Sequence, residues 1–180
     1  MRMDRRLTAW LGVSVLVAVL DQLTKLIVLA KLSLGQAIPV TGFFQLVLVY
    51  NPGAAFSFLA DHSGWQRWFF IVLAVVICGW LVVMLRQHRH ERALPLAFSL
   101  IIGGAVGNVV DRVVHGAVVD FLYFHIGRYG WPAFNVADSA ITLGVVLMLW
   151  ASFRPQRQDA NPSPSQPPPS PPSSSSEKSS

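Results

Sequence analysis

The chain has 180 residues, of which 53% are hydrophobic and 13% charged, and its formal net charge is +5 at pH 7. Soluble domains usually carry about 25% charged residues. Residues 154–180 hold eight of the twelve prolines and are otherwise mostly serine and other polar residues, so the rest of the chain is more apolar still. This composition excludes a soluble globular enzyme and a disordered chain, and it predicts a membrane protein.

Four apolar runs predict four transmembrane helices, because about 20 mainly apolar residues cross a bilayer and a helix satisfies their backbone hydrogen bonds there. The helices are expected at residues 7–30, 68–85, 93–110 and 136–153. The first run follows a cluster of arginines and resembles a secretory signal peptide. It continues past Asp21 to Ala30, and no clear small-x-small cleavage site follows its apolar core, so we expect it to remain as the first helix.

The Lys and Arg residues around these runs predict the orientation of the helices, because the cytoplasmic side carries the excess. If the N-terminus is cytoplasmic, the short segments beside the apolar runs carry eight basic residues inside and four outside, so we expect both termini in the cytoplasm. The inner residues are Arg2, Arg5, Arg6, Arg86, Arg89, Arg92, Arg154 and Arg157, and the outer ones are Lys31, Arg67, Arg112 and Arg128. Since the basic residues are spaced between apolar runs and not gathered on one face, they do not indicate nucleic acid as a partner.

Two segments on the outer side are longer than a simple link. Residues 31–66 contain FFQLVLVY, which is rich in aromatic and β-branched residues and lies between two turn signals, so we expect strands with a turn at the membrane surface. Residues 113–135 are also semi-apolar, with aromatic side chains suited to the interface. The predicted fold is therefore an all-α polytopic membrane protein with four transmembrane helices and a small extramembrane β element on its outer face.

The remaining segments indicate little chemistry of their own. The short inner link between the second and third runs is basic and contains His88 and His90. His90 is followed by Glu91, but the second His that an HExxH zinc motif requires is missing. Cys78 is the single cysteine and lies within an apolar run, where we expect a small buried hydrophobe. The expected domain organisation is a membrane domain at 1–153, followed by a disordered, cytoplasmic Pro/Ser-rich tail at 154–180.

Ionisable residues within a bilayer are functional candidates because they are costly there, and here they fall towards the outer ends of the helices. Asp21 and Lys25 are spaced i, i+4 with the acid first, the favourable order for a pair on one face, so we expect an ion pair that braces the site. Asn108, Asp111 and Arg112 share a face at the end of the third run. They could form a structural polar cluster, or the arginine could fix nearby carboxylates or bind a lipid phosphate.

Two further acids stand near the outer face in apolar surroundings. Asp138 follows Asn135 by three residues, a spacing that a helix N-cap explains. Asp120 lies in the apolar stretch VVDF, where capping explains nothing. Two carboxylates in low-polarity surroundings can share one proton, as an aspartic protease requires: one activates water and the other donates to the scissile carbonyl. Spacing alone leaves structural roles for both acids open.

Five short blocks occur in order along the four apolar runs. They are Asp21-x-x-x-Lys25, Asn51-Pro-Gly-Ala-Ala-Phe56, Gly103-Gly-Ala-Val-Gly-Asn108-Val-Val-Asp111-Arg112, Val119-Asp120-Phe121 and Phe134-Asn135-Val-Ala-Asp138. Together they resemble bacterial lipoprotein signal peptidase, the signal peptidase II family. The resemblance covers the chain from about Leu7 to Phe153, and only the Pro/Ser-rich tail departs from it.

The resemblance implies an intramembrane aspartic endopeptidase that removes the signal peptide from prolipoproteins, just before a diacylglyceryl-modified cysteine. The matching positions make Asp120 and Asp138 the catalytic pair. The site would be lined by Asn51, Gly53, Asn108, Arg112 and Asn135 and supported by Asp21 and Lys25. The implied partners are diacylglyceryl-prolipoproteins and membrane lipids, and the implied location is the bacterial inner membrane with the site towards the periplasm. We expect a monomer without a cofactor. We also expect no metal, since the sequence holds no HExxH or Cys/His ligand set.

Other functions make different demands on the sequence. Intramembrane charges also mark ion pathways, so a small ion- or proton-coupled transporter is the alternative. A pathway needs polar groups at several depths, however, and the second, third and fourth runs have no Asp, Glu, Lys or Arg in their inner halves. A non-enzymatic membrane scaffold would not need both acids. A serine nucleophile is not indicated, because no GxSxG motif occurs and Ser57 has no identifiable basic partner.

Overall fold

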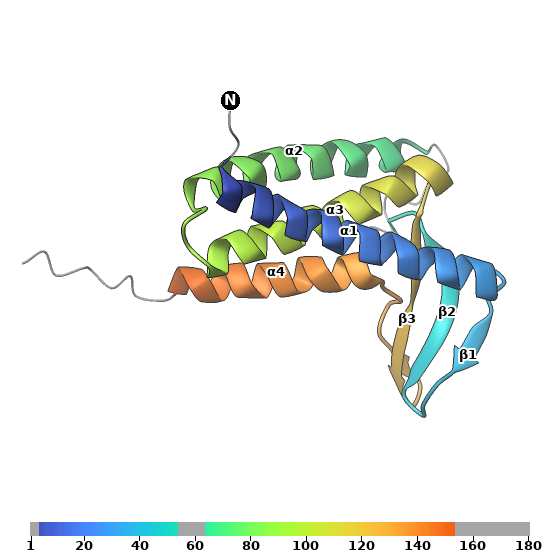
Figure 1. Ribbon diagram of the computed structural model, residues 1–180. Helices are drawn as coiled ribbons and strands as arrows, with labels where there is room; N and C mark the ends of the chain where they lie inside the picture. The colour runs from blue at the N-terminus through green and yellow to red at the C-terminus, as the bar shows by residue number, and fades with distance from the viewer. Residues whose placement is uncertain (1–3, 54–63, 154–180) are drawn as a thin grey trace, which may run out of the picture.

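The computed structural model describes residues 4–53 and 64–153. In this part of the chain, four long helices form a bundle and a small sheet extends from one end of it (Figure 1). The helices are α1 (Arg5–Lys31), α2 (Trp65–Gln87), α3 (Ala93–His115) and α4 (Val136–Phe153), and the strands are β1 (Ala37–Pro39), β2 (Phe44–Asn51), β3 (Val118–Ile126) and β4 (Tyr129–Gly130). The predicted fold class is confirmed. Arg2, Ser57, residues 54–56 of the second block and the tail at 154–180 lie outside the described residues.

All four helices are long and apolar enough to cross a membrane. The predicted bounds of α4 agree with the structure, whereas α3 continues beyond residue 110 to His115. The apolar run stops at Asp111 because that residue is charged. The helix does not stop there, since the Asp111 side chain is buried and paired within the bundle.

α3 is the central helix of the bundle. In its most apolar 18-residue window 56% of the residues are buried, against 11% in the corresponding windows of α2 and α4. α2 and α4 instead present large apolar side chains outwards, among them Trp68, Val76 and Leu143. Such surfaces suit contact with lipid, where no water is available to backbone or polar groups.

Glycines let the neighbouring helices approach α3 closely. A Cβ atom at Gly104 would overlap the backbone carbonyl oxygen of Ala137 in α4. A Cβ at Gly107 would overlap the carboxylate of Asp21 in α1. Small residues at helix crossings permit this approach in membranes generally. In this chain they bring the outer halves of α1 and α4 against the same stretch of α3.

The sheet is antiparallel throughout, with the strand order β1-β2-β3-β4. β1 and β2 confirm the strands expected in residues 31–66. β3 and β4 lie in the segment 113–135, where the sequence predicts only a semi-apolar interfacial chain and no strand. The pairing of β2 with β3 places Asn51 opposite Val118 and Val49 opposite Asp120, so a block from each outer segment meets at the base of the sheet.

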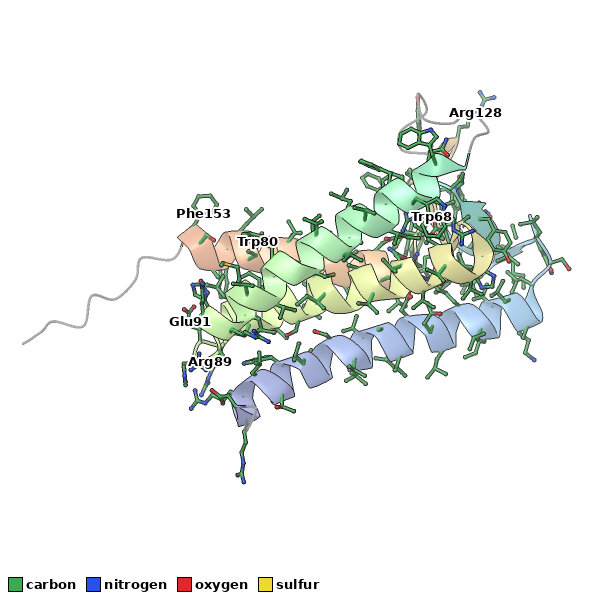
Figure 2. The ribbon with its side chains drawn as sticks, turned by 90° about the horizontal axis from the view of Figure 1, so that it is seen from above. Trp68, Trp80, Arg89, Glu91, Arg128 and Phe153 are labelled. Atoms are coloured by element: carbon green, nitrogen blue, oxygen red, sulfur yellow. The ribbon has the colours of Figure 1, made fainter. Side chains whose placement is uncertain are left out.

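At the other end of the bundle, the start of α1 meets the short link between α2 and α3. Asp4 caps α1, because its Oδ1 accepts a hydrogen bond from the backbone N–H of Arg6 at 3.0 Å. Its Oδ2 lies 2.6 Å from Nε of Arg89 in the link. Figure 2 shows Arg89 and Glu91 at this end of the molecule and Arg128 at the other, beside the sheet.

Candidate active site

The two acids singled out by the sequence lie where the sheet joins the bundle. Asp120 is in β3 and Asp138 is in the first turn of α4. The side chain of Asp120 is 1% exposed, whereas Asp138 is partly exposed. Burial of a carboxylate is costly unless hydrogen bonds compensate for the lost water, so the partners of each acid decide what it can do.

Asp120 accepts hydrogen bonds on both carboxylate oxygens. Nδ2 of Asn135 donates to Oδ1 at 2.7 Å, and Nδ2 of Asn51 donates to Oδ2 at 2.9 Å. The pKa of Asp120 is raised from 3.8 to about 6, chiefly by burial and further by the negative charge of Asp138. The two amide hydrogen bonds and the positive charge of Lys25 act in the opposite direction. The carboxyl therefore titrates close to neutral pH but is ionised at pH 7.

Asp138 is held by the neighbouring asparagines in a different way. Nδ2 of Asn108 donates to its Oδ1 at 2.8 Å, and its backbone N–H donates to Oδ1 of Asn135 at 2.9 Å. The second contact is the N-cap that the Asn135 spacing predicts. Among the described residues, no protein group donates to Oδ2 of Asp138. Asn135 thus links the two acids: its amide nitrogen contacts the Asp120 side chain, and its amide oxygen contacts the Asp138 backbone.

Each of the three asparagine amides is oriented by a donor on its oxygen side. Oδ1 of Asn51 accepts from the backbone N–H of Gly53 at 2.9 Å. Oδ1 of Asn108 accepts from Nζ of Lys25 at 3.2 Å, and Oδ1 of Asn135 accepts from the Asp138 backbone. Because every oxygen is already engaged by a donor, every amide nitrogen faces a carboxylate. Asn51, Asn108 and Asn135 therefore form a frame of amides that presents hydrogen-bond donors to both acids.

Gly53 has a specific backbone role in this frame. Its φ of 112° lies in a region that residues with a side chain rarely adopt. An added Cβ would also lie 2.5 Å from the ring of Phe70 in α2. Position 53 therefore needs glycine. The backbone N–H of Gly53 holds the Asn51 amide in the orientation in which its nitrogen donates to Asp120.

Lys25 lies at the centre of a buried ion triad. Its Nζ is 2.7 Å from Oδ2 of Asp21 and 2.7 Å from Oδ2 of Asp111, and all three side chains are at most 2% exposed. The expected pair of Asp21 and Lys25 is confirmed. A buried charge group of this kind persists only when each member is paired and hydrogen-bonded.

The triad also holds the backbone beside each acid. Oδ1 of Asp21 accepts from the N–H of Ala137 at 2.9 Å, and Oδ2 of Asp111 accepts from the N–H of Val119 at 3.0 Å. Ala137 and Val119 are the residues immediately before Asp138 and Asp120. One ammonium group therefore links α1 and α3 to both of the elements that carry the acids.

Two members of this network are absent from the predicted site. Asp111 belongs to the third of the five sequence blocks, but its ion pair with Lys25 on another helix is visible only in the structure. Gln22 donates from Nε2 to Oδ1 of Asp111 at 2.9 Å and to the carbonyl oxygen of Gly107 at 3.1 Å. A polar residue next to Asp21 in an otherwise apolar run is the signal that could have indicated it.

Arg112 contacts α2 and the backbone of its own helix. Its guanidinium lies 4.9 Å from the centre of the Phe70 ring, and NH1 donates to the carbonyl oxygen of Asn108 at 3.2 Å. Within the described part of the chain, no carboxylate is within 4.0 Å of it. Lys25, and not Arg112, forms the ion pairs with the acids of the network.

An open, mainly apolar groove of about 550 Å³ runs beside Asp138. Its lining combines the segment before α4 with the outer half of that helix, including Trp131, Phe134, Thr142 and Leu143. Among the described residues of this lining, Asp138 is the only ionisable one. The groove could therefore receive an extended apolar chain with one carboxyl group beside it.

Comparison with known proteins places this arrangement in a family. The family model described as "Signal peptidase (SPase) II" matches residues 13–154. A lipoprotein signal peptidase of Azoarcus sp. (strain BH72) is 69% identical over 158 residues, which cover 88% of this chain and 90% of that protein. A lipoprotein signal peptidase of Cupriavidus taiwanensis is 56% identical over 149 residues, covering 83% of this chain and 85% of that protein.

Solved structures agree with the sequence relatives. A bacterial membrane enzyme solved at 2.3 Å resolution superposes with a TM-score of 0.71 at 33% identity, covering 81% of this chain and 87% of that one. A second, solved at 1.9 Å, gives a TM-score of 0.68 at 32% identity, covering 82% and 94%. The resemblance read from the five blocks is confirmed, and the transporter alternative finds no support in these comparisons. This chain, a peptidase that spans the membrane several times, belongs to the signal peptidase II family.

Proposed function

We propose that this chain is an aspartic endopeptidase that removes signal peptides from diacylglyceryl-modified prolipoproteins, with Asp120 and Asp138 as its catalytic pair. The peptidase activity and the prolipoprotein substrates rest on its family and on relatives that are lipoprotein signal peptidases. The aspartic mechanism rests on one observation. The two acids, from β3 and α4, are hydrogen-bonded by Asn51, Asn108 and Asn135, and Asp138, unlike Asp120, is among the described residues that line the apolar groove.

The hydrogen bonds support different roles for the two acids. Asp120 accepts an N–H on each oxygen, which favours its ionised form and makes it the general base. Asp138 has one oxygen, Oδ2, that no described protein group donates to and that can therefore carry a proton, and the residue lines the groove. Asp138 is therefore the general acid. Two acids with different surroundings can in this way divide acid and base work at one pH.

The reaction follows from these roles. Asp120 takes a proton from a water molecule as the water oxygen attacks the scissile carbonyl carbon, and Asp138 gives its proton to the carbonyl oxygen. The resulting tetrahedral diol collapses when Asp138 takes back a hydroxyl proton. The C–N bond then breaks, and the leaving amine receives the proton held by Asp120. Both carboxyls return to their starting forms, and no acyl-enzyme is formed.

The position of the site supports a lipid-modified substrate. The acids lie at the end of the membrane-spanning helices where the sheet begins, and the groove beside Asp138 is apolar. A diacylglyceryl cysteine keeps its acyl chains in the bilayer, which places the bond before that cysteine at this depth. We further propose that this end faces the periplasm, with the helices in the bacterial inner membrane, both termini cytoplasmic, lipid as the surrounding partner and a single chain as the active unit.

The test is cleavage by the purified full-length protein in lipid nanodiscs, with a diacylglyceryl-modified prolipoprotein and the same prolipoprotein without its lipid. We expect cleavage of the lipidated substrate only, immediately before the modified cysteine, and no labelling by a serine-directed covalent inhibitor. Efficient cleavage of both substrates would contradict the lipid requirement. An inhibitor adduct that forms only on the active protein would contradict the aspartic mechanism.

A further inference from the structure

A second site lies at the end of the bundle farthest from the sheet, and the proposed peptidase function does not use it. There the start of α1 meets the link between α2 and α3, as Figure 2 shows around Arg89 and Glu91. Nε of Arg89 is 2.6 Å from Oδ2 of Asp4, and Nε1 of Trp10 donates to the carbonyl oxygen of Arg89 at 3.3 Å. These contacts hold the link against α1.

A pocket of about 280 Å³ lies between these two segments. The side chains that decide its character are those of Arg6, Trp10, Arg89, His90, Glu91 and Arg92. Its lining therefore carries three guanidinium groups and one carboxylate, that of Glu91. The charge of Arg89 is neutralised by Asp4. The hydrogen bonds that Asp4 accepts from the Arg6 backbone and from the Arg89 side chain lower the pKa of the Asp4 carboxyl.

The other two arginines lack an acidic partner within the described residues. No carboxylate lies within 4.0 Å of the guanidinium of Arg6 or of Arg92. Among the described residues, the guanidinium of Arg6 has one hydrogen-bond acceptor, the carbonyl oxygen of His90, at the long distance of 3.5 Å. Both side chains are exposed, so their donors can turn towards a ligand in the pocket. Guanidinium groups match the oxygens of a phosphate well, because their donors form a planar fork.

The start of α3 adds to the positive potential. Arg92 is its N-cap residue, makes no side-chain cap hydrogen bond, and no acid follows in the first turn. The first N–H groups of a helix lack partners within the helix and carry the positive end of its dipole. α1 differs here, since Asp4 caps it. The helix start and the two arginines thus act in the same direction.

The level of the pocket in the bilayer identifies the source of the phosphate. α1 begins at Arg5, α2 ends at Gln87 and α3 begins at Ala93, so the pocket lies where the membrane-spanning segments end. This is the depth of lipid headgroups, and Trp10 is a side chain typical of that interface. Basic pockets between transmembrane helices bind anionic headgroups in other membrane proteins.

We propose that this pocket binds the headgroup phosphate of an anionic phospholipid, with Arg6 and Arg92 as the donors and the Arg89–Asp4 pair as the fixed wall. Glu91 opposes the ligand and limits its affinity. The same contacts that form the pocket join α1 to the α2–α3 link, so a bound lipid stabilises the folded bundle.

The test uses the purified full-length protein with phosphatidylglycerol, phosphatidylcholine or free glycerol phosphate as the probe. Retained lipid is counted by native mass spectrometry, and thermal unfolding is followed in each probe. We expect wild type to retain phosphatidylglycerol about tenfold better than phosphatidylcholine and to unfold at a higher temperature with it. Equal retention of the two lipids would overturn the proposal. Equal protection by glycerol phosphate would overturn the assignment to a membrane lipid.

Matched variants locate the effect. Arg6→Gln combined with Arg92→Gln should abolish the preference for phosphatidylglycerol, whereas Arg128→Gln, an exposed arginine at the sheet end, should retain it. Glu91→Gln should strengthen the preference, because it removes the opposing carboxylate, and this gain does not depend on whether the double variant folds. A preference that survives in the double variant and does not change in Glu91→Gln would contradict the site.

Discussion

At the residue scale, the site is a set of hydrogen bonds whose directions are fixed. Asn135 contacts the Asp120 side chain with its nitrogen and the Asp138 backbone with its oxygen. The sequence predicts half of this role, since a helix N-cap is readable from the spacing of Asn135 and Asp138. The contact of Asn135 with Asp120 requires β3 to lie beside the start of α4, and the local spacing of residues does not predict this arrangement.

The pH dependence of cleavage follows from Asp120. Its pKa is raised to about 6, and the general base must be ionised, so kcat/KM should fall as the pH drops through about 6. Asn51→Ala removes a hydrogen bond that lowers this pKa, so the acidic limb should move to higher pH. The measurement is a pH–rate profile of both proteins. An acidic limb that stays in place in the variant would contradict the role of Asp120.

The Lys25 triad predicts non-additive effects on stability. Lys25→Met leaves Asp21 and Asp111 buried without their cation, which should lower the free energy of unfolding by about 3–5 kcal/mol. Adding Asp111→Asn removes one of the stranded charges, so the double variant should be more stable than Lys25→Met alone. Lys31→Met, at the exposed end of the same helix, is the matched control and should change little. Thermal unfolding in one detergent compares wild type, Lys31→Met, Lys25→Met, Asp111→Asn and the double variant, and additive losses would contradict the triad.

At the element scale, the central helix α3 brings the site together. Apolar runs predict the four helices well because a membrane span needs length and apolarity, and both are local properties. They end α3 too early, because a charge ends a run but does not end a helix when its partner lies on a neighbouring one. β3 is missed for a related reason: its stretch VVDFLYFHI has strand-forming residues, but its pairing with β2 is a long-range contact.

The packing of α4 on α3 gives a prediction about glycine. In Gly104→Ala the new methyl group would overlap the Ala137 carbonyl and push away the start of α4, which carries Asp138. We expect cleavage to fall by more than about tenfold, since small displacements of a catalytic group are costly. The control is Gly79→Ala in α2, where the added atom meets open space and alanine is the better helix former. Equal activity of the two variants would contradict the close packing at Gly104.

At the scale of the whole molecule, composition and charge predict a membrane protein and its orientation but do not identify the reaction. The peptidase assignment comes from five blocks in register and is confirmed by the family match. The network of Lys25, Asp111 and Gln22 could not be predicted in this way, because it joins α1 to α3, two helices that are distant in the sequence.

The proposed orientation can be measured with the single cysteine as an advantage. Two variants are made in a Cys78→Ser background. Arg128→Cys should react with a membrane-impermeant thiol reagent that is added to intact spheroplasts. Arg89→Cys should react only after the membrane is opened. The reason is the positive-inside distribution of Lys and Arg, which places the sheet end outside. Labelling of position 89 in intact spheroplasts would contradict the orientation.

The central claim is that Asp120 and Asp138 carry out the cleavage. The most direct measurement compares single-turnover cleavage of the lipidated prolipoprotein by wild type, Asp120→Asn and Asp138→Asn, with Glu177→Gln, an acid of the Pro/Ser-rich tail, as a carboxylate control and thermal unfolding as the test of folding. We predict a loss of about 10³-fold or more in each aspartate variant, with both proteins folded, and wild-type rates in the control. Substantial cleavage by either folded aspartate variant would contradict the account.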